Sequence, residues 1–213
     1  NLEKKKEALL QPGIDWESFD DMIAHSRKIK IIGGEPTVAP DMFRLLDRCV
    51  ETGHAEHIEL SFYTNITNMQ DKWLEQLGKF EKAIVNCSLE GMGFMNDYLR
   101  PPSKWNSVWQ KFDKLVKYSN TKEGKRIKVR VTTVNQITNA LHIADFWEFM
   151  HEYQMEHDRG IAMSTNQLVE PNYYSMAYAP EWLRKEQEER IMRFLTKIGN
   201  SPHFTDYEEP LLE

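Results

Sequence analysis

The sequence predicts an α/β fold in which parallel strands are joined by helices. Short strand-like segments alternate with longer segments of helical periodicity five times along the chain. Alternation of this kind is typical of parallel sheets with helical crossovers. No low-complexity linker or internal repeat divides the 213 residues, which are enough for one core without disulfides or metals. An open doubly wound sheet and a closed or partial barrel both fit this pattern.

Five segments have the length and composition of β-strands. They are short, rich in β-branched or aromatic residues, and followed by turn-forming residues. In chain order they are residues 28–32, 57–63, 82–89, 127–134 and 161–169. The first of them stops at the pair Gly33–Gly34.

Six segments carry apolar residues at spacings of three and four, which predicts amphipathic helices. They are residues 16–28, 40–50 and 71–80, a helix beginning after Ser103, a helix beginning after Asn139, and residues 180–198. Asp15 and Ser103 are the predicted N-caps, because their side-chain oxygens can accept backbone hydrogen bonds. Tryptophans at apolar helix positions, Trp182 among them, are expected to pack against the strands.

Composition argues against several classes of protein. A net charge of −6 argues against a dedicated nucleic-acid binder. No apolar run approaches the ~20 residues that a membrane span needs, so we expect no membrane partner and a cytoplasmic location. The two cysteines, Cys49 and Cys87, have neither metal-binding nor disulfide-framework spacing. The chain begins at Asn1 rather than Met, and we expect it to be a fragment with further sequence upstream.

Small, hydrogen-bonding residues follow every predicted strand, and a ligand site is expected where those ends converge. The same residue types also favour turns, which is the simpler explanation for any single end. The strand end with the most specific sequence is Gly33-Gly34-Glu35-Pro36. The glycines let a ligand approach the backbone, Glu35 supplies an acceptor, and Pro36 removes a competing N–H. This combination predicts a receptor for an ammonium group.

Four motifs together resemble the radical S-adenosylmethionine superfamily, most closely its members with a twitch-type C-terminal extension. They are residues 31–37 (IIGGEPT), 60–65 (LSFYTN), 88–91 (SLEG) and 98–105 (YLRPPSKW), and the resemblance spans residues 29–195. It implies a partial (β/α)6 barrel whose second to sixth strands are the five predicted here. Residues 1–198 would form this core without its first strand and cluster loop. Residues 199–213 would form an irregular tail leading to a C-terminal extension.

The resemblance implies a binding site for the methionine part of S-adenosylmethionine. Its ammonium group would be held by the segment Gly33, Gly34, Glu35 and Pro36. Arg100 matches an arginine that pairs with the methionine carboxylate, a role that suits the guanidinium fork. Thr64 and Asn65 match a Thr-Asn pair near the site.

The resemblance also implies contacts with the nucleoside part. Ser88 lies where the superfamily places a hydroxyl near the carboxylate or ribose. Glu90 replaces the Asp of a Ser-x-Asp-Gly motif and would accept hydrogen bonds from ribose hydroxyls. Asn135 and the backbone at Leu168 are weaker matches for the ribose and adenine sides.

The superfamily's Cys-x3-Cys-x2-Cys motif, which holds a four-iron, four-sulfur cluster, is not in this chain. Cys49 and Cys87 cannot replace it, and we expect the cluster ligands upstream. The implied function is reductive cleavage of S-adenosylmethionine to a 5′-deoxyadenosyl radical, which abstracts hydrogen from a peptide or small metabolite. An external donor would supply the electron. The alternative is a non-catalytic S-adenosylmethionine-binding module that has lost the cluster. No residue of this chain is assigned a catalytic or metal-binding role.

Overall fold

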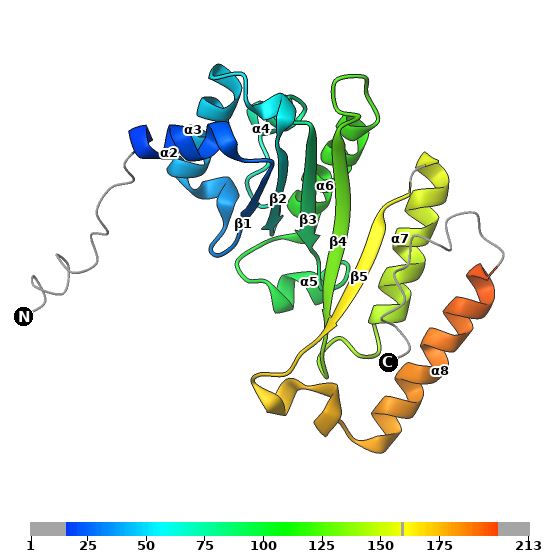
Figure 1. Ribbon diagram of the computed structural model, residues 1–213. Coiled ribbons are helices and arrows are strands. Elements are labelled where there is room, and N and C mark those ends of the chain that lie inside the picture. Colours follow the sequence, from blue (N-terminus) through cyan, green and yellow to red (C-terminus); the bar gives the residue numbers. More distant parts are fainter. Residues whose placement is uncertain (1–15, 159, 200–213) are drawn as a thin grey trace, which may run out of the picture.

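The computed structural model describes residues 16–158 and 160–199. Their strands form one five-stranded sheet in the order β1-β2-β3-β4-β5, and every neighbouring pair is parallel. The strands are β1 (Lys28–Ile31), β2 (Glu59–Thr64), β3 (Lys82–Ser88), β4 (Ile127–Asn135) and β5 (Ala162–Gln167). In Figure 1 all five run in the same direction, so their carboxyl ends lie along one edge of the sheet.

The strand order decides between the two architectures that fit the sequence. Each strand pairs with the one that precedes it in the chain, as in a (β/α) barrel, whereas a doubly wound sheet reverses direction at a switch point. The register advances regularly, with Lys28 beside Glu59 and Glu59 beside Lys82. The predicted partial barrel of parallel strands with outer helices is therefore confirmed.

Helices join the strands, and most of them match the sequence prediction. The helices are α2 (Trp16–His25), α3 (Pro40–Glu51), α4 (Asp71–Leu77), α5 (Phe94–Leu99), α6 (Trp105–Ser119), α7 (Ile143–His157) and α8 (Glu181–Ile198). Short 3₁₀ turns complete the connections: η1 (Pro36–Val38), η2 (Ala55–His57), η3 (Asn172–Tyr174) and η4 (Met176–Tyr178). Figure 1 shows α2 and α3 beside β1, and α7 and α8 beyond β5.

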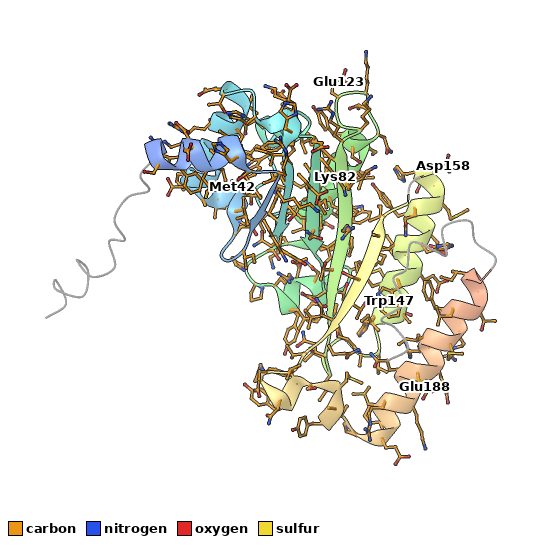
Figure 2. The ribbon with its side chains drawn as sticks, viewed as in Figure 1. Met42, Lys82, Glu123, Trp147, Asp158 and Glu188 are labelled. Atoms are coloured by element: carbon orange, nitrogen blue, oxygen red, sulfur yellow. The ribbon has the colours of Figure 1, made fainter. Side chains whose placement is uncertain are left out.

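The apolar faces of the helices cover the sheet. On α3 the buried residues are Met42, Leu45, Leu46 and Cys49, which share a face at spacings of three and four. On α7 the buried set includes Trp147, which is 2% exposed and packs near Phe194 of α8. Figure 2 labels Met42 and Trp147 at opposite ends of this layer. One continuous core thus extends from α2 to α8.

Three details differ from the sequence prediction. α5 was not predicted, because its six residues are too few to show helical periodicity. Ser103 is not the N-cap of α6. Lys104 occupies that position, the Ser103 hydroxyl donates to the Arg100 carbonyl, and the Asp97 carboxylate accepts from the Trp105 N–H. Trp182 is 64% exposed, because it lies on the outer face of α8.

Asp15 and residues 200–213, for which a cap and an irregular tail were predicted, lie outside the described residues. Among the helices that the structure describes, none combines the length and hydropathy that crossing a bilayer requires.

Candidate functional site

A cavity of about 710 Å³ opens at the carboxyl edge of the sheet. This volume lies within the range of about 300–1,000 Å³ that is usual for small-molecule sites. Its lining combines the loop after β2, the loop after β3, the start of α6 and the ends of β4 and β5. The polar and charged lining residues are Asn65, Thr67, Glu90, Arg100, Ser103, Lys104, Ser107 and Gln136, and Leu168 adds an apolar surface. Four residues singled out from the sequence thus line one cavity: Asn65, Glu90, Arg100 and Leu168.

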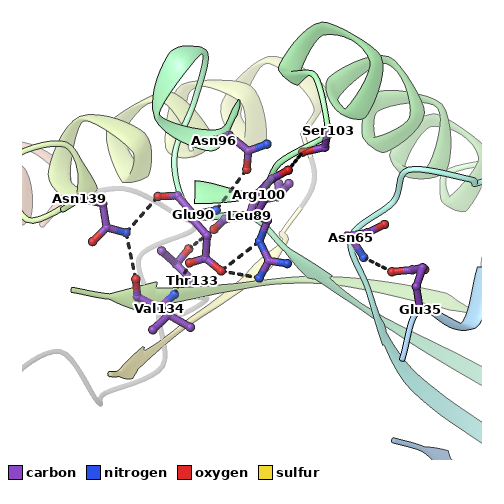
Figure 3. A network of polar contacts seen from close by, with 10 residues as sticks. All are labelled: Glu35, Asn65, Leu89, Glu90, Asn96, Arg100, Ser103, Thr133, Val134 and Asn139. Carbon is purple, nitrogen blue, oxygen red and sulfur yellow. Dashed lines mark hydrogen bonds and ion pairs between the residues drawn. The ribbon is translucent and has the colours of Figure 1, made fainter. Parts of the chain in front are cut away.

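Glu90 and Arg100 form an ion pair in the wall of this cavity (Figure 3). The Arg100 Nε lies 3.1 Å from Glu90 Oε1, and Arg100 Nη2 donates to the same oxygen. The second oxygen, Oε2, accepts from the Val134 N–H at 2.6 Å. The Glu90 side chain is 6% exposed and that of Arg100 is 30% exposed. Glu90 is thus satisfied within the chain, and Arg100 reaches from it into the cavity.

The loop that carries Glu90 is held by buried amides and hydroxyls, which Figure 3 shows around it. The Asn139 side chain donates to the Glu90 carbonyl at 3.0 Å and to the Val134 carbonyl at 2.9 Å. The Thr133 hydroxyl donates to the Leu89 carbonyl at 2.8 Å. Gly91 turns the chain here with φ +154°, and a Cβ at this position would lie 2.9 Å from Met95. The position of Glu90 is therefore fixed by its backbone as well as by its side chain.

The Glu35 carboxylate connects the loop after β1 to the end of β2. Its Oε1 accepts from the Thr37 N–H, the Thr37 hydroxyl and, at 2.6 Å, the Thr64 hydroxyl. Its Oε2 accepts from the Asn65 N–H at 2.7 Å, a contact drawn in Figure 3. Ile66 follows with φ +61° although it is β-branched and 0% exposed. This conformation is strained for such a residue, and the Thr64 hydroxyl, which accepts from the Ile66 N–H, supports it.

Gly33 and Gly34 are exposed at the end of β1 and adopt φ +97° and +56°. A Cβ at either glycine would meet nothing within 4 Å, so a ligand could approach this backbone. Together with Glu35 and Pro36 they line a second, mostly apolar cavity of about 230 Å³ between α2 and α3. The Glu35–Asn65 contact joins the linings of the two cavities.

Three predicted site residues line neither cavity, namely Thr64, which contacts Glu35, and Ser88 and Asn135. Ser88 is half-buried at the last position of β3. Asn135, at the end of β4, is 6% exposed and exchanges side-chain hydrogen bonds with Gln187 of α8. Its Nδ2 also lies 3.1 Å from Gln167 Oε1. Asn135 thus binds α8 to the carboxyl edge of the sheet.

The cysteines do not fit an iron–sulfur cluster. Cys49 lies on the buried face of α3 and Cys87 directly precedes the last residue of β3, and both are 0% exposed. Burial raises the pKa of the Cys49 thiol to about 11 and raises that of Cys87 as well. Cluster ligands are thiolates, which these positions disfavour. The described residues contain no group of three potential metal ligands.

The chain is a partial-barrel α/β protein with a ligand-sized cavity at the carboxyl ends of its strands. Solved structures of other proteins have a similar fold. One is Streptococcus suis SuiB bound to S-adenosylmethionine, with a TM-score of 0.58 and 14% identity over 88% of this chain. Another is SuiB bound to precursor peptide SuiA, with a TM-score of 0.58 and 15% identity over 89% of this chain. The present chain covers 42% and 41% of those two chains. No protein-family model and no curated protein matches it.

Sequence reasoning did not identify the residues that hold the site in place. Asn96, Asn139 and Gln187 are all buried polar side chains, 1%, 0% and 6% exposed. In the sequence Asn139 is only the residue before a predicted helix, and Gln187 lies in a helix rich in charged residues. A polar residue on the otherwise apolar face of α8, near Leu183, was the available signal for Gln187.

Proposed function

We propose that this chain is the S-adenosylmethionine-binding barrel of a radical S-adenosylmethionine enzyme that acts on a peptide. The observation that carries the proposal is the cavity whose wall holds Arg100 against Glu90, at the carboxyl edge of a parallel partial barrel. Support comes from the four sequence motifs and from the likeness to SuiB, which has been crystallised with S-adenosylmethionine and with a precursor peptide.

Arg100 would bind the methionine carboxylate. Two of its nitrogens, Nε and Nη2, donate to Glu90, and among the described residues Nη1 has no hydrogen-bond partner. With its side chain 30% exposed, Arg100 can present this nitrogen to the cavity. Glu90 then acts as a positioning residue, because its two contacts fix the plane of the guanidinium. This role takes the place of direct ribose binding by Glu90, because only 6% of its side chain is exposed and its Oε1 already accepts both hydrogen bonds from Arg100.

The ammonium group would bind at the end of β1. Oε1 of Glu35 already accepts three hydrogen bonds, whereas Oε2 accepts one, from Asn65. A carboxylate oxygen accepts about two hydrogen bonds, so Oε2 has room for one more. The exposed backbone of Gly33 and Gly34 adds carbonyl acceptors beside it. These groups would orient the ligand, and bound S-adenosylmethionine would supply the hydrogen-abstracting chemistry of the class.

Calorimetric titration of the full chain with S-adenosylmethionine tests this proposal. We expect weak binding, with a Kd on the order of 0.1 mM, because a few charged hydrogen bonds must offset the lost translational freedom of the ligand. Arg100→Lys keeps a cation beside Glu90 but loses the fork, and should weaken binding at least tenfold. The matched control Lys104→Arg changes an exposed cation at the same cavity and should bind like the parent. Equal binding by Arg100→Lys, or no binding by the parent at millimolar ligand, would contradict the proposal.

The second candidate is an S-adenosylmethionine-binding module that carries no cluster, and both candidates require that the two buried thiols of this chain bind none. Anaerobic treatment of this chain with iron and sulfide should produce no broad absorbance near 400 nm, because neither Cys49 nor Cys87 is accessible as a thiolate. Stoichiometric binding of about four irons per chain, measured with a colorimetric iron assay, would contradict this expectation.

A further inference from the structure

A third cavity, lined by charged residues, lies at the amino edge of the sheet, opposite the candidate site. Its volume is about 550 Å³, and its lining comes from the first residues of the strands and the loops that lead into them. We call it the amino-edge groove. Its six basic residues are Arg27, Lys28, Lys82, Lys125, Arg126 and Lys128, and its two acidic residues are Glu59 and Glu81. Figure 2 labels Lys82 near this edge, at the start of β3.

The sheet itself places these cations. Lys28, Glu59 and Lys82 are register partners on β1, β2 and β3, and Lys128 pairs with Ile84 of β3. The Arg126 carbonyl accepts from the Ala83 N–H at 3.0 Å, which holds the loop before β4 against β3. The backbone of the residues that carry these charges is therefore fixed by the hydrogen bonds of the sheet.

Four of the six cations form no ion pair with a residue that the structure describes, although Arg126 Nη1 donates to the Phe80 carbonyl at 3.4 Å. Glu59 pairs with Lys82 at 3.2 Å and with Lys28 at 3.6 Å, and its pKa is lowered chiefly by the hydrogen bond from Lys82. Among the described residues, the ammonium groups of Lys125 and Lys128 form no ion pair. The lining has six formal positive and two negative charges, although the chain has a net charge of −6. Clefts lined by one sign of charge concentrate counter-ions.

We propose that the amino-edge groove binds an acidic segment of a partner protein. Three of its cations lie on β1, β3 and β4 and the other three directly precede β1 or β4, and the three strand spacings of about 4.8 Å from β1 to β4 span about 14 Å. A single phosphate would reach only part of this distance, whereas four or five extended acidic residues, at about 3.3 Å each, would cover it. The lining contains no aromatic residue on which a base could stack, and four of its six cations are lysines. Both facts favour carboxylates over nucleic acid.

Fluorescence anisotropy with a labelled hexaglutamate peptide and the full chain tests the proposal. We expect saturable binding at low salt that weakens as salt is added. Lys125→Glu/Lys128→Glu should weaken it about tenfold, because two attractions become repulsions. Lys125→Gln/Lys128→Gln should give a smaller loss. The control Arg184→Glu/Lys185→Glu makes the same charge change at exposed positions of α8 and should bind like the parent.

Two competing probes complete the test, namely tripolyphosphate and a 12-nucleotide oligothymidylate. Failure of hexaglutamate to bind, or equal weakening by the α8 control, would overturn the proposal. Tighter binding of either competitor, lost in Lys125→Glu/Lys128→Glu, would assign the groove to a different ligand and overturn it too. S-adenosylmethionine titration of the groove variants should match the parent, because the two cavities lie at opposite edges. The two proposals can therefore fail independently.

Discussion

Arg100 donates two hydrogen bonds to a single oxygen of Glu90, while the other oxygen of Glu90 accepts from the backbone of β4. The two residues are ten positions apart, and the short helix α5 between them brings them together. The residue that the resemblance assigns to a ligand carboxylate is therefore already positioned by a carboxylate of its own chain. We therefore expect Arg100 to stabilise the fold, in addition to the binding role proposed for it.

Arg100→Ala should lower the free energy of unfolding by about 2 kcal/mol, because it leaves the buried Glu90 carboxylate without its cation. Urea denaturation measures this change. The double variant Glu90→Gln/Arg100→Ala should be more stable than Arg100→Ala, since its side chain at position 90 is neutral. Lys104→Ala, at an exposed position on the same loop, should change the free energy by less than about 0.5 kcal/mol. If the double variant is no more stable than Arg100→Ala, the pairing energy is misassigned.

Gln187→Leu should cost about 1–3 kcal/mol of unfolding free energy. Its amide donates to Asn135 Oδ1 at 2.8 Å and to the Ala140 carbonyl at 3.2 Å, and both acceptors are buried. Amide hydrogen exchange should show faster opening of α8 in this variant. The neighbouring Glu188→Leu, at an exposed position of the same helix, should change neither quantity appreciably. Similar effects of the two substitutions would show that the amide contacts contribute little.

Ile66 offers a test of backbone strain. At φ +61° glycine is favoured over alanine, so Ile66→Gly should be more stable than Ile66→Ala by about 1 kcal/mol. Both variants lose the buried side chain, and their difference isolates the backbone. Ile58 is equally buried but has φ −110°, and there Ile58→Gly should be the less stable of the pair. Thermal denaturation of the four variants gives the two differences, and the same order at both positions would contradict the assigned conformation.

The buried thiols should make the protein less stable at alkaline pH. Above pH 9 the unfolded chain loses thiol protons that the folded chain keeps until the pKa of about 11 at Cys49, or higher at Cys87. The unfolded state then binds fewer protons, so the free energy of unfolding falls by about 1.4 kcal/mol per pH unit for each thiol. Urea denaturation between pH 8 and pH 10.5 should show a shallower decline for Cys49→Ala/Cys87→Ala. Parallel declines in the two proteins would contradict the prediction.

Strands and long helices could be predicted because their burial pattern is local. The alternation in β4 and the apolar face of α3 follow directly from residue order. The choice between a barrel and a doubly wound sheet could not be made from periodicity, because strand order depends on long-range pairing. The prediction that Trp182 packs against the strands was wrong, because it is 64% exposed. The residue type alone does not show which face of a helix a tryptophan occupies.

The candidate site was predicted in part for a similar reason. Polar residues at strand ends were visible in the sequence, and Asn65, Glu90, Arg100 and Leu168 line one cavity. The hydrogen-bond partners of the site residues could not be inferred, because such partners can lie far apart in the sequence. Asn135 and Gln187, for example, are 52 positions apart. The assigned roles in ligand binding stay predictions until the titrations are done.

The order of the strands also has a consequence for synthesis on the ribosome. Because each of β2 to β5 pairs with the strand made just before it, each new strand emerges next to an edge that has already formed. Among the five described strands, none has to wait for a partner encoded far downstream, as the central strands of a doubly wound sheet must. The sheet can therefore grow from β1 to β5 in step with translation, and its outermost edge at any moment is a template for the next segment.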